Sequence, residues 1–279
     1  MTLSCTYIHP PAINCEATFA RLIVCIDGIG LWMSSNTLKL NAEKMQFTCL
    51  NTKYQLAKVD GYVLVANGSV VTCLSITIDQ ELTFADHIRQ LTGRCFYCLR
   101  QLRSIRRMLT SDTITTLVNT LVVSWIDYCN AVLTGVHEVH LRQLQRVLNA
   151  AAQLIVCKRK YDSISATIRD VLHWLPIRQR VDFKMCVTVF NSLHNQAPNY
   201  LSTMCRLVAE NPSRRHLRLA ARGDLAVPAI RTIRYGLRSF AVAGPSTWNS
   251  LPASLRNCHL PSAFRRELKT ELFAGAYFY

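Results

Sequence analysis

One pair of cysteines and one pair of histidines in this chain have spacings that metal sites use. Cys95-x-x-Cys98 has the separation of two zinc thiolates, and His137-x-x-His140 has that of two ligands on one helical turn. No second CxxC or CxxH stands at zinc-finger distance. We therefore expect no metal site: the thiols should pack on an apolar helix face, and the histidines should lie near a helix start.

The acidic residues are scattered in a way that argues against phosphoryl transfer. The chain has 17 of them, and no two are adjacent. Two-metal chemistry needs carboxylates that converge on the ions, usually including a tight acidic pair on a turn. The motifs GxxxxGK[ST], GxGxxG, HExxH and GxSxG are also missing from the sequence. We predict that the chain is not an enzyme and carries no cofactor.

The remaining candidate functional residues are arginines, which could bind a polyanion. The segment Asp86–Leu109 has apolar residues every three or four positions, and it contains six arginines against Asp86 as its only acidic residue. A solvated surface is one interpretation of such a helix; a nucleic-acid-binding face is the one we favour, because neutralising partners are missing. Tyr97 is the aromatic residue to test for base stacking. The predicted nucleic-acid-binding residues are Arg89, Arg100, Arg103, Arg107, Lys158, Arg159 and Lys160.

Composition agrees with a polyanionic partner. The net charge is +15 with a pI near 9.5, and the basic residues are spread over the last two thirds of the chain. Such a field attracts phosphate backbones or anionic lipid, and the planar fork of arginine suits phosphate. No run of about 18 uncharged apolar residues predicts a membrane span. Twelve scattered cysteines without a signal peptide indicate reduced thiols, and hence the nucleus or cytoplasm.

The N-terminal third is expected to be α+β. Residues 1–18 should form an irregular lead-in, and residues 19–82 should begin with a helix over Phe19–Met33. Asn67-Gly68 predicts a hairpin turn between the last two of three β-type runs. These runs are Met45–Leu50, Tyr62–Ala66 and Ser69–Ile78.

The rest of the chain is expected to be mostly α-helical, so that the fold class is α+β, mostly α. Residues 83–205 should form an antiparallel bundle with short connections, and residues 206–279 a loop-rich basic extension that ends in a helix over Ser262–Phe273. Trp125, Trp174 and Trp248 are expected as core anchors. The bundle helices are predicted over 86–109, 111–135, 141–160, 163–175 and 178–194.

Five blocks of sequence follow one another in a specific order between residues 20 and 270. They are Trp32-Met-Ser-Ser-Asn-Thr-Leu-Lys-Leu-Asn-Ala-Glu-Lys44, Ile76–Ile88, Ile126-Asp-Tyr-Cys-Asn130, His173-Trp-Leu-Pro-Ile-Arg178 and Trp248-Asn-Ser-Leu-Pro252. Together they resemble the reverse transcriptases of non-LTR retrotransposons of the LINE type. The resemblance covers nearly the whole chain.

This resemblance implies the C-terminal part of a polymerase: the end of the palm, the primer-grip hairpin, a helical thumb and a C-terminal extension. By this analogy Lys44 matches a palm lysine near the departing pyrophosphate, the strand pair ending at Asp79 matches the primer grip, and residues 86–109 match the first thumb helix. The family's Y/F-A-D-D turn is absent, so the Mg²⁺ chemistry of the intact family is not expected. Ser75 replaces the glycine of an L-G-V-x-x-D pattern.

Three hypotheses for function follow. The leading one is a truncated, catalytically inactive reverse-transcriptase remnant that binds RNA or an RNA–DNA duplex weakly and without sequence preference. The second is a helical protein-interaction module whose arginines meet an acidic protein or an anionic membrane. The third is a retrotransposon relic without a selected function.

Overall fold

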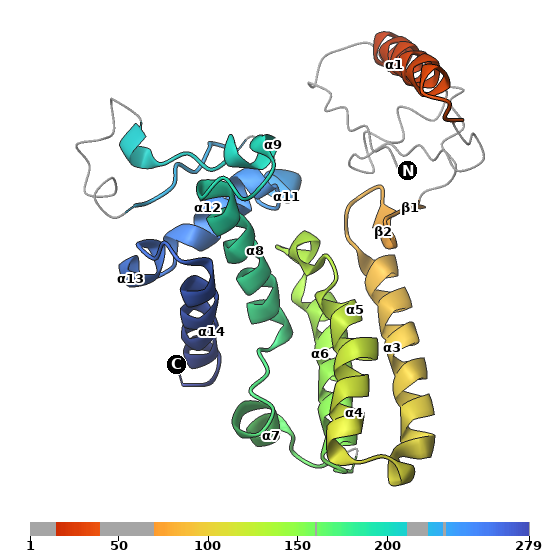
Figure 1. Cartoon of the computed structure of the whole chain (residues 1–279), viewed down its shortest axis with the longest axis vertical. Coiled ribbons are helices and arrows are strands. Elements are labelled where there is room, and N and C mark those ends of the chain that lie inside the picture. The colour runs from red at the N-terminus through yellow and green to blue at the C-terminus, as the bar shows by residue number, and fades with distance from the viewer. Residues whose placement is uncertain (1–14, 40–69, 160, 211–222, 231–232, 279) are drawn as a thin grey trace. The chain divides into compact units, whose positions relative to one another are not determined.

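A computed structural model of the chain describes residues 15–39, 70–159, 161–210, 223–230 and 233–278 (Figure 1). It divides into two compact units, Met1–His87 and Ile88–Tyr279. Helices dominate, with one small antiparallel sheet, which confirms the expected fold class. Among the described residues, no helix is long and apolar enough to cross a membrane.

The first unit contains the helix α1, Cys15–Ser35, which confirms the predicted helix and extends it at both ends. Residues 15–18 are therefore helical rather than irregular. The helix ends where the Ser35 hydroxyl donates to the carbonyl of Leu31 and the Asn36 amide donates to that of Trp32, each at 2.8 Å. These bonds satisfy carbonyls that the end of a helix leaves without an intrahelical partner. Lys44, the two earlier β-type runs and Asn67-Gly68 lie outside the described residues.

The predicted strand over Ser69–Ile78 is wrong as a single strand, because the chain reverses in its middle. The strands β1, Val70–Cys73, and β2, Ile76–Asp79, pair antiparallel with Cys73 opposite Ile76. Leu74 and Ser75 form the connecting loop, with φ values of 47° and 65°. A two-residue hairpin loop with two positive φ angles matches the right-handed twist of its strands.

A carboxylate at the end of β2 holds the start of the next helix. Asp79 accepts hydrogen bonds from the backbone N–H groups of Thr83 and Phe84, both at 2.8 Å, and from the Thr83 hydroxyl at 2.8 Å. The Thr83 hydroxyl in turn accepts from the N–H of Ala85 at 3.3 Å. The helix α3, Ala85–Ile105, begins there and continues into the second unit.

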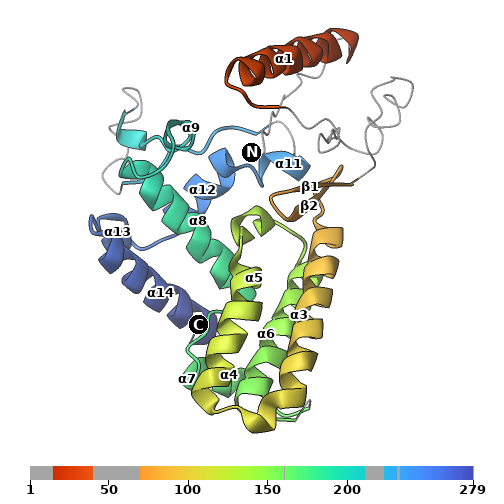
Figure 2. The same ribbon diagram turned by 45° about the vertical axis from the view of Figure 1, so that its right-hand side comes forward.

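The first part of the second unit is the expected antiparallel arrangement of helices, and Figures 1 and 2 agree in placing α3, α4 and α6 side by side. The α4 and α6 helices contact each other directly. The elements are α3, a 3-10 turn η2 (Arg106–Met108), α4 (Ser111–Val118), a π turn η3 (Asn119–Val123), α5 (Ser124–Asp127), a 3-10 turn η4 (Asn130–Leu133) and α6 (Glu138–Ile155).

The π turn between α4 and α5 changes which residues face the core. A π turn uses more residues per turn than an α-helix, so the 3.6-residue period that starts in α4 does not continue past it. Trp125 is consequently 41% exposed, and its prediction as a core anchor is wrong. Trp174 and Trp248 are buried, as predicted. The helix also ends earlier than expected, at Asp127 rather than near Gly135.

The fourth predicted helix is shorter than its pattern suggested. The helix α7 covers Ser165–Asp170 and ends because the N–H groups of Val171 and Leu172 both bond to the carbonyl of Thr167. His173 then adopts a positive φ of 48°, which reverses the chain before α8, Ile177–Leu193.

The chain after α8 packs back onto it and is more helical than its proline and glycine content suggested. The helix α12 begins inside the segment expected as loops or short strands, and it has Pro245 within it. Phe190 of α8 stacks on Phe264 of α14 at 4.3 Å between ring centroids, and Trp248 packs beside them. The elements are α9 (Asn199–Ser202), η5 (Val208–Glu210), α11 (Ile233–Gly236), α12 (Phe240–Asn249), α13 (Ala253–Arg256) and α14 (Pro261–Tyr277).

Candidate nucleic-acid interface

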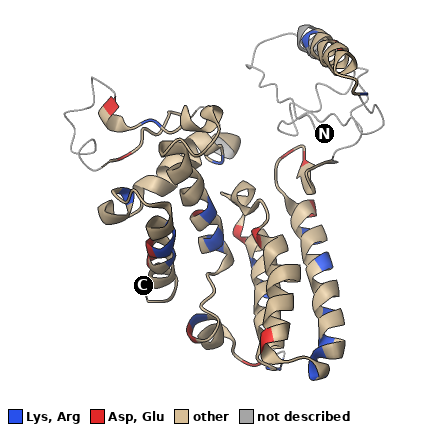
Figure 3. Cartoon of the chain, in the orientation of Figure 1, with Lys and Arg blue, Asp and Glu red and all other residues tan. Residues whose placement is uncertain are grey.

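The spacing of four predicted arginines places them on one exposed line along α3 and the turn that follows it, and Figure 3 colours the basic residues of this region blue. We call this set, Arg89, Arg100, Arg103 and Arg107, the arginine stripe. At 1.5 Å per residue the stripe extends about 21 Å from Arg89 to Arg103. The buried face of α3, with Ile88, Cys95, Leu99 and Leu102 all in the core, lies about 100° around the helix from the stripe. Burial of that face fixes the rotation of the helix and keeps the stripe in solvent.

The last three arginines of the stripe have no neutralising partner. Within the described part of the chain, Arg100, Arg103 and Arg107 make no hydrogen bond or ion pair. The reason lies in the sequence, because α3 has no acidic residue after Asp86. A bound phosphate would therefore not have to displace a carboxylate from these guanidinium groups.

Arg106 is adjacent to the stripe but has a structural role. Its guanidinium donates to the carbonyls of Leu154 and Ile155 at 3.1 and 3.0 Å, and to that of Leu109 at 3.0 Å. Leu154 and Ile155 are the last residues of α6, whose final carbonyls lack intrahelical partners. Arg106 thus ties the end of α3 to the end of α6. The arginine excess in the sequence did not distinguish this residue from those of the stripe.

The second predicted basic cluster follows directly after α6, and therefore after the carbonyls that Arg106 binds. Lys158 is already engaged: its ammonium donates to the Ser163 carbonyl at 3.0 Å and to the Thr167 hydroxyl at 2.9 Å. The side chain of Arg159 is exposed. Lys160 lies outside the described residues.

An aromatic residue that the sequence analysis did not select lies in line with the stripe. Phe96 and Gly93 fall between Arg89 and Arg100 at the same alternation of four and three residues, and Phe96 is 41% exposed. Tyr97, the predicted stacking residue, is also exposed but points about 100° away around the helix. The spacing of Phe96 relative to the arginines was the signal that would have identified it.

Of the paired cysteines on α3, Cys95 is buried in the core and Cys98 is partly exposed, and neither thiol is prepared to bind metal. Burial, together with the charge of Cys98, raises the pKa of Cys95 to about 12, and burial also raises the pKa of Cys98. Metal ligation requires the thiolate. His137 is the N-cap of α6, where its ring accepts from the N–H of Val139 at 3.4 Å. Across the described ranges, no group of three His, Cys, Asp or Glu is placed to hold a metal ion.

Comparisons of this chain with protein-family models, with curated proteins and with solved structures give no match. The resemblance to LINE reverse transcriptases therefore rests on the five sequence blocks alone.

Proposed function

We propose that this chain binds the phosphate backbone of RNA or of an RNA–DNA duplex through the arginine stripe, as the thumb of a reverse transcriptase would. Binding is weak and independent of sequence, because phosphate contacts carry no base information. The observation that carries the proposal is the row of exposed, unpaired guanidinium groups at Arg100, Arg103 and Arg107.

The arrangement of the stripe suits a backbone better than a small anion. Its last three arginines span about 10 Å along one line, so they would meet successive phosphates rather than converge on one. Guanidinium groups bind phosphate oxygens with paired donors, which gives stronger and more directional contacts than a lysine ammonium. Phe96, on the same line, adds a flat apolar face against which a base or sugar could pack.

The proposal does not include nucleotide transfer. The sequence has no adjacent acidic pair of the kind that two-metal chemistry uses, so the proposal is confined to binding.

The test compares two triple variants that lose the same charge. The first carries Arg100→Gln, Arg103→Gln and Arg107→Gln, and the second, the control, carries Arg94→Gln, Arg265→Gln and Arg266→Gln at other exposed positions. Fluorescence anisotropy with an RNA–DNA duplex should show at least about tenfold weaker binding for the stripe variant, because each lost contact is worth on the order of 1 kcal/mol. The control should change by less than about threefold. Equal affinities for the two variants would contradict the proposal.

A further inference from the structure

Two turns of the second unit lie at the same end of the helical bundle, as both Figure 1 and Figure 2 show. One is the η2 turn after α3, and the other follows α6 and carries residues 156–159 and 161–162. Arg106 joins them, because its guanidinium binds the carbonyls of Leu154 and Ile155 at the end of α6. We call four exposed residues of these turns the bundle tip: Arg107, Met108, Arg159 and Tyr161.

The bundle tip presents the two most exposed large apolar side chains of the described residues. Tyr161 is 91% exposed and Met108 is 87% exposed. Single exposed apolar residues are ordinary on a protein surface, but here the two extremes occur at one end of one bundle. Both side chains are open to a partner.

Guanidinium groups flank these apolar side chains. Arg107 directly precedes Met108, and Arg159 lies two residues before Tyr161. Neither guanidinium makes a hydrogen bond or ion pair with any residue that the structure describes. The nearby carboxylate of Asp162 accepts the backbone N–H of Arg159 instead, at 2.8 Å. The charge at the tip therefore suits an anionic partner.

The turn that carries Arg159 and Tyr161 is held in place by hydrogen bonds. Besides accepting from Arg159, Asp162 donates its own N–H to the Arg159 carbonyl at 3.1 Å. The N–H of Lys158 donates to the Gln153 carbonyl in the last turns of α6 at 3.0 Å. A binding surface that is already ordered loses less conformational entropy when its partner binds.

An aromatic ring beside guanidinium groups is the combination that binds unpaired nucleotides. The ring stacks on a base while the guanidinium groups bind phosphate oxygens. A base inside a duplex is already stacked on both faces, so only an unpaired base has a face to offer.

We propose that the bundle tip binds an unpaired nucleotide of a nucleic acid whose paired part lies along the arginine stripe. Tyr161 stacks on the base, and Arg159 binds its phosphate. Arg107 belongs to both the stripe and the tip, so the two surfaces are continuous. The inference rests on the proposed function and adds to it a preference for nucleic acids with single-stranded extensions.

An anionic membrane is the other partner that exposed apolar residues and arginines can bind. A single myristoyl chain gives only marginal membrane binding, and Met108 and Tyr161 together offer less apolar surface than such a chain. The continuity of the tip with a line of arginines also favours a strand over a flat lipid surface.

Paired and unpaired substrates test the inference directly. In fluorescence anisotropy, the full chain should bind an RNA–DNA duplex with a four-nucleotide single-stranded extension about fivefold or more tightly than the same duplex with blunt ends. Each strand is extended in turn, and the inference requires the preference for at least one of them. An extension of four abasic sites adds the same phosphates without bases, and it should lose the preference.

Variants of the tip locate the contact. Tyr161→Ser should abolish the preference and change the affinity for the blunt duplex by less than about twofold, while Tyr161→Phe should keep the preference. The matched control is Tyr200→Ser, at a tyrosine that is 64% exposed and lies outside the tip, and it should keep the preference as well. Arg159→Gln should weaken binding of the extended duplex by about threefold or more and leave the blunt duplex unchanged.

Three results would overturn the inference: equal affinities for extended and blunt duplexes, an equal gain from the abasic extension, or a preference that Tyr161→Ser retains. Phosphatidylserine vesicles supply the remaining arm. Vesicle binding that Tyr161→Ser weakens, without any preference for the extended duplex, would assign the tip to a membrane instead. The stripe is tested on the blunt duplex alone, so its failure and that of the bundle tip are seen in different measurements.

Discussion

Ser75 occupies a backbone position that favours glycine. Its φ of 65° lies in the left-handed region, which costs a residue with a Cβ about 1–2 kcal/mol. The family pattern that this segment resembles has glycine at the same place, so the resemblance and the geometry agree on what the hairpin needs.

Ser75→Gly should therefore stabilise the hairpin. We expect a gain of about 0.5–1 kcal/mol, because relief of the left-handed strain exceeds the extra entropy that glycine loses on folding. Hydrogen exchange of the β1 and β2 amides measures this gain in the stability of the hairpin. Ser104→Gly, at an exposed position in the last turn of α3, is the matched control and should leave the exchange of the β1 and β2 amides unchanged. Faster exchange in β1 and β2 of the Ser75 variant would contradict the account.

Asp79 makes the start of α3 dependent on pH. Partial burial raises the pKa of Asp79, but hydrogen bonds from Thr83 and Phe84 outweigh this and hold that pKa below its ordinary value of 3.8. A carboxyl whose pKa is lowered in the folded state contributes stability above its unfolded pKa and loses it as the pH falls through the folded value.

Asp79→Asn should consequently destabilise the chain at neutral pH but not in acid. We expect a loss of about 1 kcal/mol at pH 7, since the carboxylate is only half-buried and partly screened by water. Urea unfolding at a series of pH values should show the gap between variant and unaltered chain closing as the pH falls below 3.8. Glu271→Gln, an exposed change on α14, controls for the loss of one charge. If the difference in unfolding free energy between the variant and the unaltered chain stayed constant with pH, the charge of the Asp79 carboxylate would not be the source of the stabilisation.

At the scale of helices and strands, periodicity predicted the long regular elements and failed where the backbone departs from α geometry. The helices α3, α6 and α8 were predicted because their apolar residues keep a 3.6-residue period throughout, and that face is the one buried. The π turn before α5 broke the period and exposed Trp125. Gly244-Pro245 indicated a loop, although both residues lie inside α12.

Gly244 lies where α12 packs closely against α8. A Cβ at that position would lie 3.0 Å from Val189 of α8 and 3.3 Å from Phe240, so the absence of a side chain lets the two helices approach. Gly244→Val should destabilise the chain by about 1–3 kcal/mol through overpacking. Thermal unfolding measures the loss. Gly93→Val, where a Cβ meets nothing within 4 Å, should be close to neutral. Similar losses at both positions would mean that the contact with Val189 does not matter.

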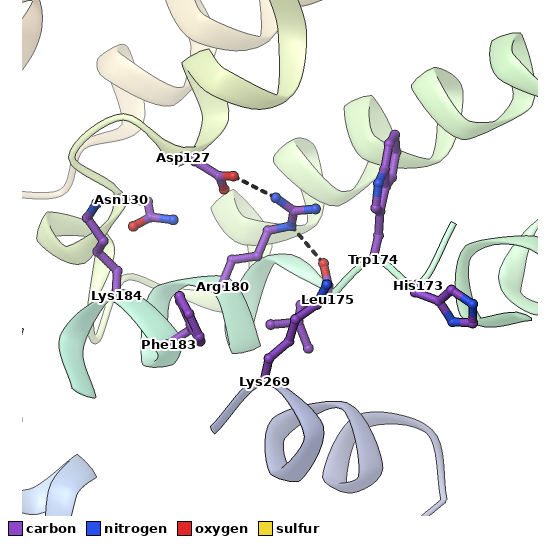
Figure 4. A pocket seen from close by; sticks show the side chains of 9 residues that line it. All are labelled: Asp127, Asn130, His173, Trp174, Leu175, Arg180, Phe183, Lys184 and Lys269. Carbon is purple, nitrogen blue, oxygen red and sulfur yellow. Dashed lines mark hydrogen bonds and ion pairs between the residues drawn. The ribbon is translucent and has the colours of Figure 1, made fainter. Parts of the chain in front are cut away.

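At the scale of the whole molecule, the sequence predicted the basic face of α3 but not the contacts made between distant segments. The burial of α3 and the exposure of its arginines follow from spacing within one helix. The bonds from Arg106 to the end of α6 join residues 48 and 49 positions apart, and the ion pair of Arg180 with Asp127 joins residues 53 apart. Local periodicity carries no information about such pairs. Two of the resemblance blocks, Ile126–Asn130 and His173–Arg178, also line one pocket (Figure 4), which their order in the sequence did not indicate.

The central claim is that the arginine stripe binds phosphates, and the salt dependence of binding tests it most directly. Each phosphate contact contributes a slope of roughly −0.9 to a plot of log affinity against log salt for a duplex. The variant with Arg100, Arg103 and Arg107 changed to Gln should therefore have a slope shallower by about three than that of the unaltered chain. The control triple variant at Arg94, Arg265 and Arg266 should keep the original slope. Equal slopes for all three proteins on the RNA–DNA duplex would contradict the account.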